Sequence, residues 1–272
     1  MKQKIALGLA ALGTAAAMLP LFAAFEAHVI NVTAKIENAL RVDPHFLNFG
    51  TVFPQEKLEK PVDIQLSQSF QAEPRVDDVE YFIRQKPKCG ITWNNGTEID
   101  LTADSSNPVN HLYTKTGHWV KDQGAWMIDC GTPPRTLTTT PNAETWGPLP
   151  VICPYLSKHS EVVHDAQGVF VGYEDGALPS FHEPWDLSAT STNIKWNDVH
   201  GRLSKAAHDI KDTWMIDLAV PCFGGYCAQD WADFVHGINP QADPNAYTQP
   251  IANEHKIFGC DLWVEVEGVS EN

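Results

Sequence analysis

The sequence predicts an all-β sandwich that carries a long loop-rich insertion and one or two short helices. Several short runs alternate between apolar and polar side chains, which is the period of a half-buried strand. Proline and glycine separate these runs at short intervals, as they do between the strands of a sandwich. Six cysteines follow a signal-like N-terminus, and an even number of cysteines in an exported chain is typical of a disulfide-linked extracellular protein.

The first expected element is a secretory signal peptide at residues 1–24. The first four residues include the basic Lys2 and Lys4, Ile5–Met18 is an unbroken run of small and apolar residues, and Pro20 interrupts it. Cleavage after Ala24, or as late as Ala27, places a phenylalanine three residues before the cut instead of a small residue. An uncleaved anchor helix is the alternative, but Pro20 and the absence of a basic stop-transfer flank argue against it. We therefore expect export, with a signal peptidase as partner and no stable membrane span after cleavage.

The next expected element is a strand at His28–Leu40. It alternates, with Ile30, Val32, Ala34 and Ile36 on one face and polar residues on the other. Such a strand usually pairs within its own domain, because consecutive strands tend to be neighbours. It can instead add to the open sheet edge of a neighbouring copy. That contact is head-to-tail and open, so it builds a filament.

Residues 28–272 are expected to form a single domain, with the insertion at about residues 90–210. Further alternating runs predict strands, a run with one apolar side predicts a short helix, and an apolar run between turn-forming residues predicts half of a hairpin. The strands are expected at Val62–Phe70, Val79–Ile83, Thr213–Pro221 and within Ile257–Val269, the helix at Ala228–His236, and the hairpin strand at Val169–Tyr173.

The cysteines predict three disulfides in the exported part of the chain. A metal site would need paired C-x2-C units, and the sequence has none. The connectivity stays open, with a preference for Cys222 with Cys260 because two late strands are expected to be neighbours. The six residues are Cys89, Cys130, Cys153, Cys222, Cys227 and Cys260.

The charge balance argues against nucleic acid as a partner. Lysine and arginine together number 19 against 34 acidic residues, which gives a formal net charge of −15. Binding to nucleic acid depends on clustered cations, and this chain has an excess of carboxylates. Solubility outside the cell explains the charge most simply, while calcium binding near Asp77, Asp78 or Asp243 is the alternative, although no EF-hand pattern is present. No other cofactor is expected.

No catalytic motif is recognisable, so we expect a protein without enzymatic activity. His159 and His164 are five residues apart, whereas a zinc site of the H-E-x-x-H type needs a spacing of four. His182 is an isolated histidine, and neither a nucleophile elbow nor a phosphate-binding glycine loop is present. The nine tryptophans fit either a sandwich core or loops that bind glycan or protein.

Four segments resemble the family of secreted proteins processed by the dedicated signal peptidase SipW, which includes TasA and camelysin. They are KIALGLAALGTAAA (Lys4–Ala17), the junction Ala23–Phe25, VTAKIENALRVDP (Val32–Pro44) and GCDLWVEVEGV (Gly259–Val269). In addition, LNFGTVFPQE (Leu47–Glu56) resembles an early turn of Ig-like surface domains.

The resemblance implies a jelly-roll-like or Ig-like sandwich that is secreted or held at the cell surface. It also implies a subunit of an extracellular filament or biofilm matrix that self-associates head-to-tail. The implied donor strand comprises Ile30, Val32, Ala34 and Ile36. The metalloprotease label sometimes given to the family has no supporting metal motif here. A monomeric surface module that recognises glycan or protein through tryptophan-bearing loops is the alternative.

Overall fold

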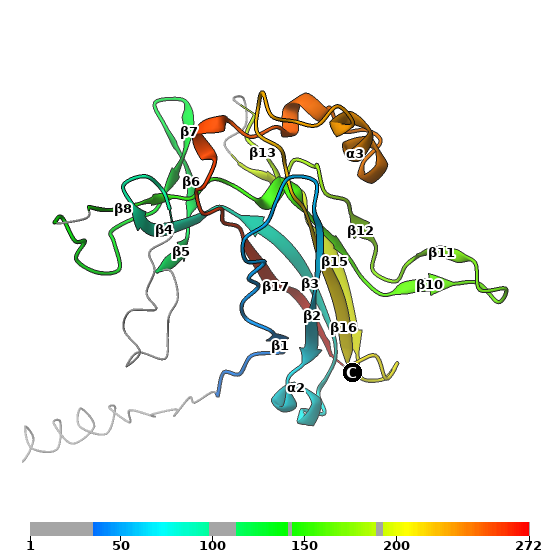
Figure 1. The fold of residues 1–272 in the computed structure, drawn as a ribbon. Coiled ribbons are helices and arrows are strands. Elements are labelled where there is room, and N and C mark those ends of the chain that lie inside the picture. Colours follow the sequence, from blue (N-terminus) through cyan, green and yellow to red (C-terminus); the bar gives the residue numbers. More distant parts are fainter. Residues whose placement is uncertain (1–34, 98–112, 141–142, 189–192, 272) are drawn as a thin grey trace, which may run out of the picture. The chain divides into compact units, whose positions relative to one another are not determined.

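The structure is a computed structural model that describes residues 35–97, 113–140, 143–188 and 193–271. The expected signal peptide and the donor-strand residues Ile30, Val32 and Ala34 lie outside the described residues. Residues Asn38–Asn272 form one compact unit. Strands dominate it, so the expected all-β class is confirmed (Figure 1).

The larger of the two main sheets, sheet A, has five strands in the order β1-β2-β16-β9-β12. All its pairs are antiparallel. The strands are β1 (Leu40–Asp43), β2 (Lys57–Leu66), β16 (Lys211–Ala219), β9 (Leu156–His159) and β12 (Ala177–Leu178).

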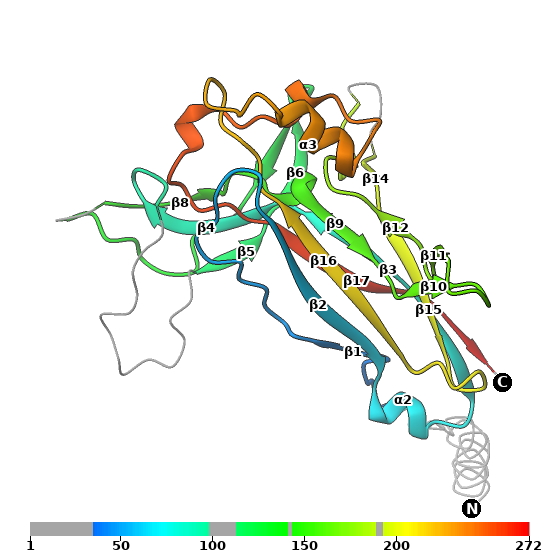
Figure 2. The same cartoon turned by 45° about the vertical axis from the view of Figure 1, so that its right-hand side comes forward.

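The second main sheet, sheet B, has three antiparallel strands in the order β15-β3-β17. These are β15 (Val199–Ser204), β3 (Val76–Lys86) and β17 (Asp261–Glu271). Figure 2 shows the long strands of both sheets running through the centre of this unit.

The core lies between the inward faces of sheets A and B, because alternation along each strand places one set of side chains inside. Sheet A contributes buried residues of β2 and β16, and sheet B contributes those of β3. The indole N–H of Trp214 donates to the Tyr81 hydroxyl (2.8 Å), and this hydroxyl donates to Asp212, so a polar chain links the sheets. The main core residues of these three strands are Val62, Ile64, Leu66, Val79, Tyr81, Ile83, Trp214, Ile216 and Leu218.

Steric contact explains why β15 has a glycine at position 201. A Cβ atom on Gly201 would overlap the ring of Tyr81 on the neighbouring strand β3. The Tyr81 ring can therefore reach Asp212 and Trp214 only because residue 201 has no side chain.

Four small antiparallel sheets surround the sandwich. β4 pairs with both β5 and β8, while β6 pairs with β7, β10 with β11 and β13 with β14. Their bounds are β4 (Lys88–Trp93), β5 (Thr114–Thr116), β6 (His118–Asp122), β7 (Ala125–Asp129), β8 (Glu144–Pro148), β10 (Val162–His164), β11 (Phe170–Tyr173), β13 (Trp185–Asp186) and β14 (Lys195–Trp196).

Most of these strands fall in the region expected to be a loop-rich insertion, but that region is not separate from the sandwich. Its strands β9 and β12 belong to sheet A, and its strand β15 belongs to sheet B. These three strands are short, and β15 carries Gly201, so their sequences lack the long alternation that marks the other main strands.

Two short α-helices are present among the described residues, α2 (Gln68–Ala72) and α3 (Trp231–Ile238). The expected strand Val62–Phe70 ends at Leu66, because the Ser67 side chain caps α2 by accepting from the Phe70 N–H (3.1 Å). Short 3-10 turns lie at Cys153–Tyr155, Pro244–Tyr247 and Ile251–Asn253.

All six cysteines form disulfides, as expected, but the preferred pair of Cys222 with Cys260 is wrong. The observed pairs are Cys89–Cys130, Cys153–Cys260 and Cys222–Cys227. Cys222 follows β16 of sheet A, whereas Cys260 precedes β17 of sheet B, so these two late strands are not neighbours. The pairing of Val151 with Gly259 instead brings Cys153 to Cys260, and a short loop returns Cys227 to Cys222.

Candidate functional site

The described end of the expected donor strand does not belong to the sandwich. A strand was expected over His28–Leu40, but residues 35–38 are not in a strand and β1 begins only at Leu40. Ile36 is 94% exposed, although the alternation predicts it on a buried face. The chain is first held to the sandwich just before β1, where Ser67 donates its N–H to the Ala39 carbonyl and its hydroxyl to the Asn38 carbonyl (2.8 and 2.6 Å).

An exposed apolar ribbon lies elsewhere in the chain, in the hairpin formed by β10 and β11. Figure 1 shows this hairpin projecting beyond the two main sheets. It continues the β9–β12 pair outward, since the Glu174 N–H donates to the Glu161 carbonyl (3.0 Å). Five large apolar side chains on it are 40–59% exposed, namely Val162, Val163, Val169, Phe170 and Val171.

The turn of this hairpin is well defined. One carboxylate oxygen of Asp165 accepts from the N–H groups of Gln167 and Val169, each at 2.9 Å. Gly168 has a φ of 78°, which favours glycine. The hairpin strand expected at Val169–Tyr173 is therefore confirmed as β11 (Phe170–Tyr173), paired with β10.

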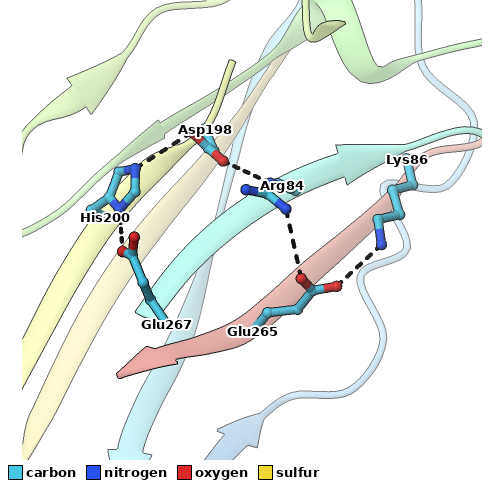
Figure 3. A network of polar contacts seen from close by, with 6 residues as sticks. All are labelled: Arg84, Lys86, Asp198, His200, Glu265 and Glu267. Atoms are coloured by element: carbon cyan, nitrogen blue, oxygen red, sulfur yellow. Dashed lines mark hydrogen bonds and ion pairs between the residues drawn. The ribbon is translucent and has the colours of Figure 1, made fainter. Parts of the chain in front are cut away.

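The outer face of sheet B carries a connected network of charged side chains (Figure 3). Arg84 lies between two carboxylates, with Nε 2.7 Å from Asp198 and Nη1 3.8 Å from Glu265. Lys86 also contacts Glu265 (3.2 Å), and His200 lies between Asp198 and Glu267 (3.4 and 3.1 Å). The network holds three carboxylates against the two cations Arg84 and Lys86, and both cations are already engaged by carboxylates.

A tryptophan cluster adjoins this network and comprises Trp119, Trp185, Trp196 and Trp263. The Lys86 ammonium lies 3.3 Å from the Trp263 ring centroid and 5.9 Å from that of Trp196. Ring contacts continue from Trp196 to Trp185 at 6.3 Å and from Trp185 to Trp119 at 5.3 Å. All four rings are half-buried, whereas Trp214 and Trp231 lie in the core. Tryptophans therefore lie both in the core and at the partly exposed surface.

Lys158 and His182 form a buried polar centre between the sheets. Within the described part of the chain, the Lys158 ammonium nitrogen is buried without a hydrogen-bond partner, and burial lowers its pKa to about 7. His182 places Nδ1 2.7 Å from the Pro179 carbonyl and Nε2 2.8 Å from the Gln85 side-chain oxygen. Burial, with the Lys158 charge, lowers the His182 pKa to about 3. Both side chains are enclosed by protein, so this centre is not positioned to act on a substrate.

A second group of perturbed acids lies where Tyr81 meets β16. Burial raises the pKa of Asp212 to about 7, and the neighbouring Asp175 and Asp209 reinforce the shift. Burial likewise raises the pKa of Asp175 to about 6. Both carboxyls therefore favour protonation in the folded state more than in the unfolded chain.

The residues considered for metal or calcium binding have other contacts. His159 lies 3.4 Å from Asp217, and His164 lies on the exposed hairpin. Asp77 accepts from the Ala206 N–H (2.9 Å), and Asp78 pairs with Arg202. The Asp243 side chain caps a 3-10 turn by accepting from the Asn245 N–H (3.0 Å). Among the described residues, no group of three or more potential ligands converges as a metal site would require.

Two shallow hollows lie beside sheet B. One of about 160 Å³ is lined by Asp78, Glu80, Gly268, Val269 and Ser270. The other, of about 410 Å³, is lined by Glu80, Glu174, Asp175, His200, Gly201, Arg202 and Glu267. Acidic side chains outnumber basic ones in both hollows, and both are open to solvent, unlike the largely apolar clefts that enclose small ligands.

No protein-family model, curated protein or solved structure matches the chain. The resemblance to the SipW-processed family therefore stays a prediction. Of the helices in the described ranges, none combines the length and the apolar character needed to cross a membrane.

Proposed function

We propose that this protein is a secreted structural surface protein, a subunit of an extracellular filament or biofilm matrix that assembles head-to-tail by donating its N-terminal segment. The observation that carries the proposal is the position of Ile36. It belongs to an alternating apolar set, yet it is 94% exposed and lies outside every strand of its own sandwich. A strand-forming sequence whose described end lies outside the sheets is suited to pairing with another copy.

The disulfides support the secreted location. Three disulfides are typical of a chain that folds in an oxidising compartment outside the cytoplasm. One of them joins Cys153, which precedes β9 of sheet A, to Cys260, which precedes β17 of sheet B. A sandwich linked in this way can stay folded without help from the N-terminal segment, as a donor subunit requires.

The test compares the mature protein with a variant that lacks residues 28–37. Negative-stain microscopy and sedimentation measure assembly, and thermal unfolding by circular dichroism measures folding. We expect the full mature protein to form filaments and the deletion variant to stay folded and dispersed. Filaments in the deletion variant, its unfolding, or a fully dispersed mature protein at high concentration would each contradict the proposal.

A matched pair of variants separates the two faces of the donated segment. Replacing Ile30, Val32 and Ile36 by threonine keeps β propensity but removes the apolar face, so assembly should fail. Replacing Asn31 and Thr33 by serine changes only the polar face and should leave filaments intact. Equal effects of the two variants would show that alternate side chains do not direct the contact.

The second candidate is a monomeric surface module that binds a neutral ligand, and the tryptophan cluster favours it. Indole rings present flat apolar faces with one polar N–H, and the adjacent charges already contact one another. A glycan rather than a charged peptide fits such a surface. Tryptophan fluorescence titration with neutral oligosaccharides tests this function, and a response that survives W196A would remove the cluster as the site.

A further inference from the structure

We infer that the β10–β11 hairpin of one copy is the acceptor for the N-terminal segment of the next copy. The inference depends on the proposed function and names the surface that receives the donated strand. The partner is a second copy of this chain, through its residues 28–37.

The hairpin has the surface that strand addition needs. Its five apolar side chains are 40–59% exposed in a segment that runs only from Val162 to Tyr173. An isolated two-stranded ribbon is marginally stable in water, and an exposed apolar one invites further pairing. A third strand would cover part of this surface and satisfy one row of backbone groups.

Both long edges of the hairpin lack a strand partner among the described residues. β10 pairs with β11 alone, and β11 pairs with β10 alone. The pairing of β9 with β16 reaches only His159, opposite Met215, so the chain leaves sheet A before β10 begins. An incoming strand therefore does not need to displace a pairing already present.

The acidic charge of the hairpin favours the N-terminal segment, and not a second hairpin, as the strand that binds to it. Residues 159–176 contain Glu161, Asp165, Glu174 and Asp175 and no lysine or arginine. Two hairpins side by side would repel one another. In residues 28–37, Lys35 balances Glu37, and four apolar side chains alternate along one face. This segment can cover the valines without adding like charge.

The chain enters sheet A at one edge, and the acceptor hairpin extends from the other edge. The N-terminal segment leads into β1, the first strand in the order β1-β2-β16-β9-β12, while the hairpin extends from the β9–β12 pair at the other edge. A contact between two different patches is heterologous, so it can continue from copy to copy.

The outer edge of β17 is the main competing acceptor, and its sequence is less suited. β17 is an 11-residue edge strand, but its register shifts near Gly268 and again before Glu271. Such irregularities and edge charges are ways in which proteins prevent strand addition. The β17 residue Glu265 is moreover already engaged by Lys86 and Arg84.

The experiment uses mature protein that lacks residues 28–37, titrated into a fluorescent peptide of residues 28–37 and followed by anisotropy. We expect saturable binding that V163T/V171T weakens by about tenfold or more. The matched control is V266T/V269T on β17, whose valines are 43% and 46% exposed, and it should bind like the parent. V171T alone should weaken binding in the same direction, which guards against a fold defect in the double variant.

Each result bears on the inference separately from the proposed function. Unchanged peptide binding by V163T/V171T, or loss of binding only in V266T/V269T, would overturn the hairpin as acceptor. Neither result would alter the filament test with the deletion variant. Thermal unfolding of the variants should match the parent, because the replaced side chains are substantially exposed. A large loss of stability would show that the valines serve the fold and would also overturn the inference.

Discussion

Removing the Cys153–Cys260 disulfide should destabilise the fold much more than removing Cys222–Cys227. The first pair is separated by 107 residues and the second by five. The chain-entropy relation gives a stabilisation of about 4.8 kcal/mol for the first and about 2.1 kcal/mol for the second at 25 °C. The long loop runs from the start of β9 in sheet A to the start of β17 in sheet B, so this disulfide limits how far these two chain segments can separate when the protein is unfolded.

The two pairs suit a matched comparison because their burial is alike. Cys153 and Cys222 are each at most 1% exposed, while their partners are half-buried. The packing lost by substitution with alanine is therefore similar in C153A/C260A and C222A/C227A. Urea unfolding should give a difference of about 2.7 kcal/mol in the free energy of unfolding between these variants. An equal cost, or a greater cost for C222A/C227A, would refute the reasoning from loop length.

Three further predictions concern the interior. The raised pKa of Asp212, about 7 against an ordinary 3.8, means that its contribution to stability is lost as pH rises from about 4 through 7. The free energy of unfolding of D212N, measured with urea relative to that of the parent, should therefore be higher at pH 8 than at pH 5. A difference between the two proteins that does not change with pH would contradict this. K158M should stabilise the fold by roughly 1–3 kcal/mol, because it removes a buried amine without a hydrogen-bond partner among the described residues. The lowered pKa of Lys158, about 7 against an ordinary 10.5, makes this gain largest below pH 7 and smaller as the pH rises toward 10.5. A lower melting temperature in K158M at pH 6 would show that the amine has a favourable partner. G201A should cost about 1–3 kcal/mol or more because its Cβ overlaps Tyr81, whereas G147A meets no atom within 4 Å and serves as the control. Equal melting temperatures for these two variants would argue against the overlap.

Periodicity located part of each long strand but not its bounds. The expected run Val62–Phe70 shares Val62–Leu66 with β2, and Val79–Ile83 lies within β3. Of the short strands, β11 was indicated by its apolar run, whereas β9 was not. β9 reads LSKH and places Lys158 on the inward face, so its pattern opposes the burial it undergoes. Long-range contacts with the rest of sheet A determine that these residues form a strand, and no local sequence pattern predicts such contacts.

The candidate surfaces were predictable in composition but not in arrangement. The sequence indicates an apolar run at Val169–Tyr173, but such a run is equally typical of a buried strand. Its exposure follows from the departure of β10 from sheet A after His159, which depends on the fold. In the same way, Lys86 and Glu265 are 179 positions apart, and only the pairing of β3 with β17 brings them together.

The division of roles within the chain links the fold to the proposed assembly. The sandwich is internally complete, with a core closed between two sheets and three disulfides linking its segments. Several large apolar side chains remain exposed outside this core, among them Ile36 at the end of the donor sequence and the valines of the β10–β11 hairpin. A closed symmetric dimer would need one self-complementary patch, but here the donor sequence and the hairpin differ in charge and lead from opposite edges of sheet A. If they meet, each copy therefore keeps one unused feature for the next copy, and this is the property that distinguishes a growing filament from a dimer.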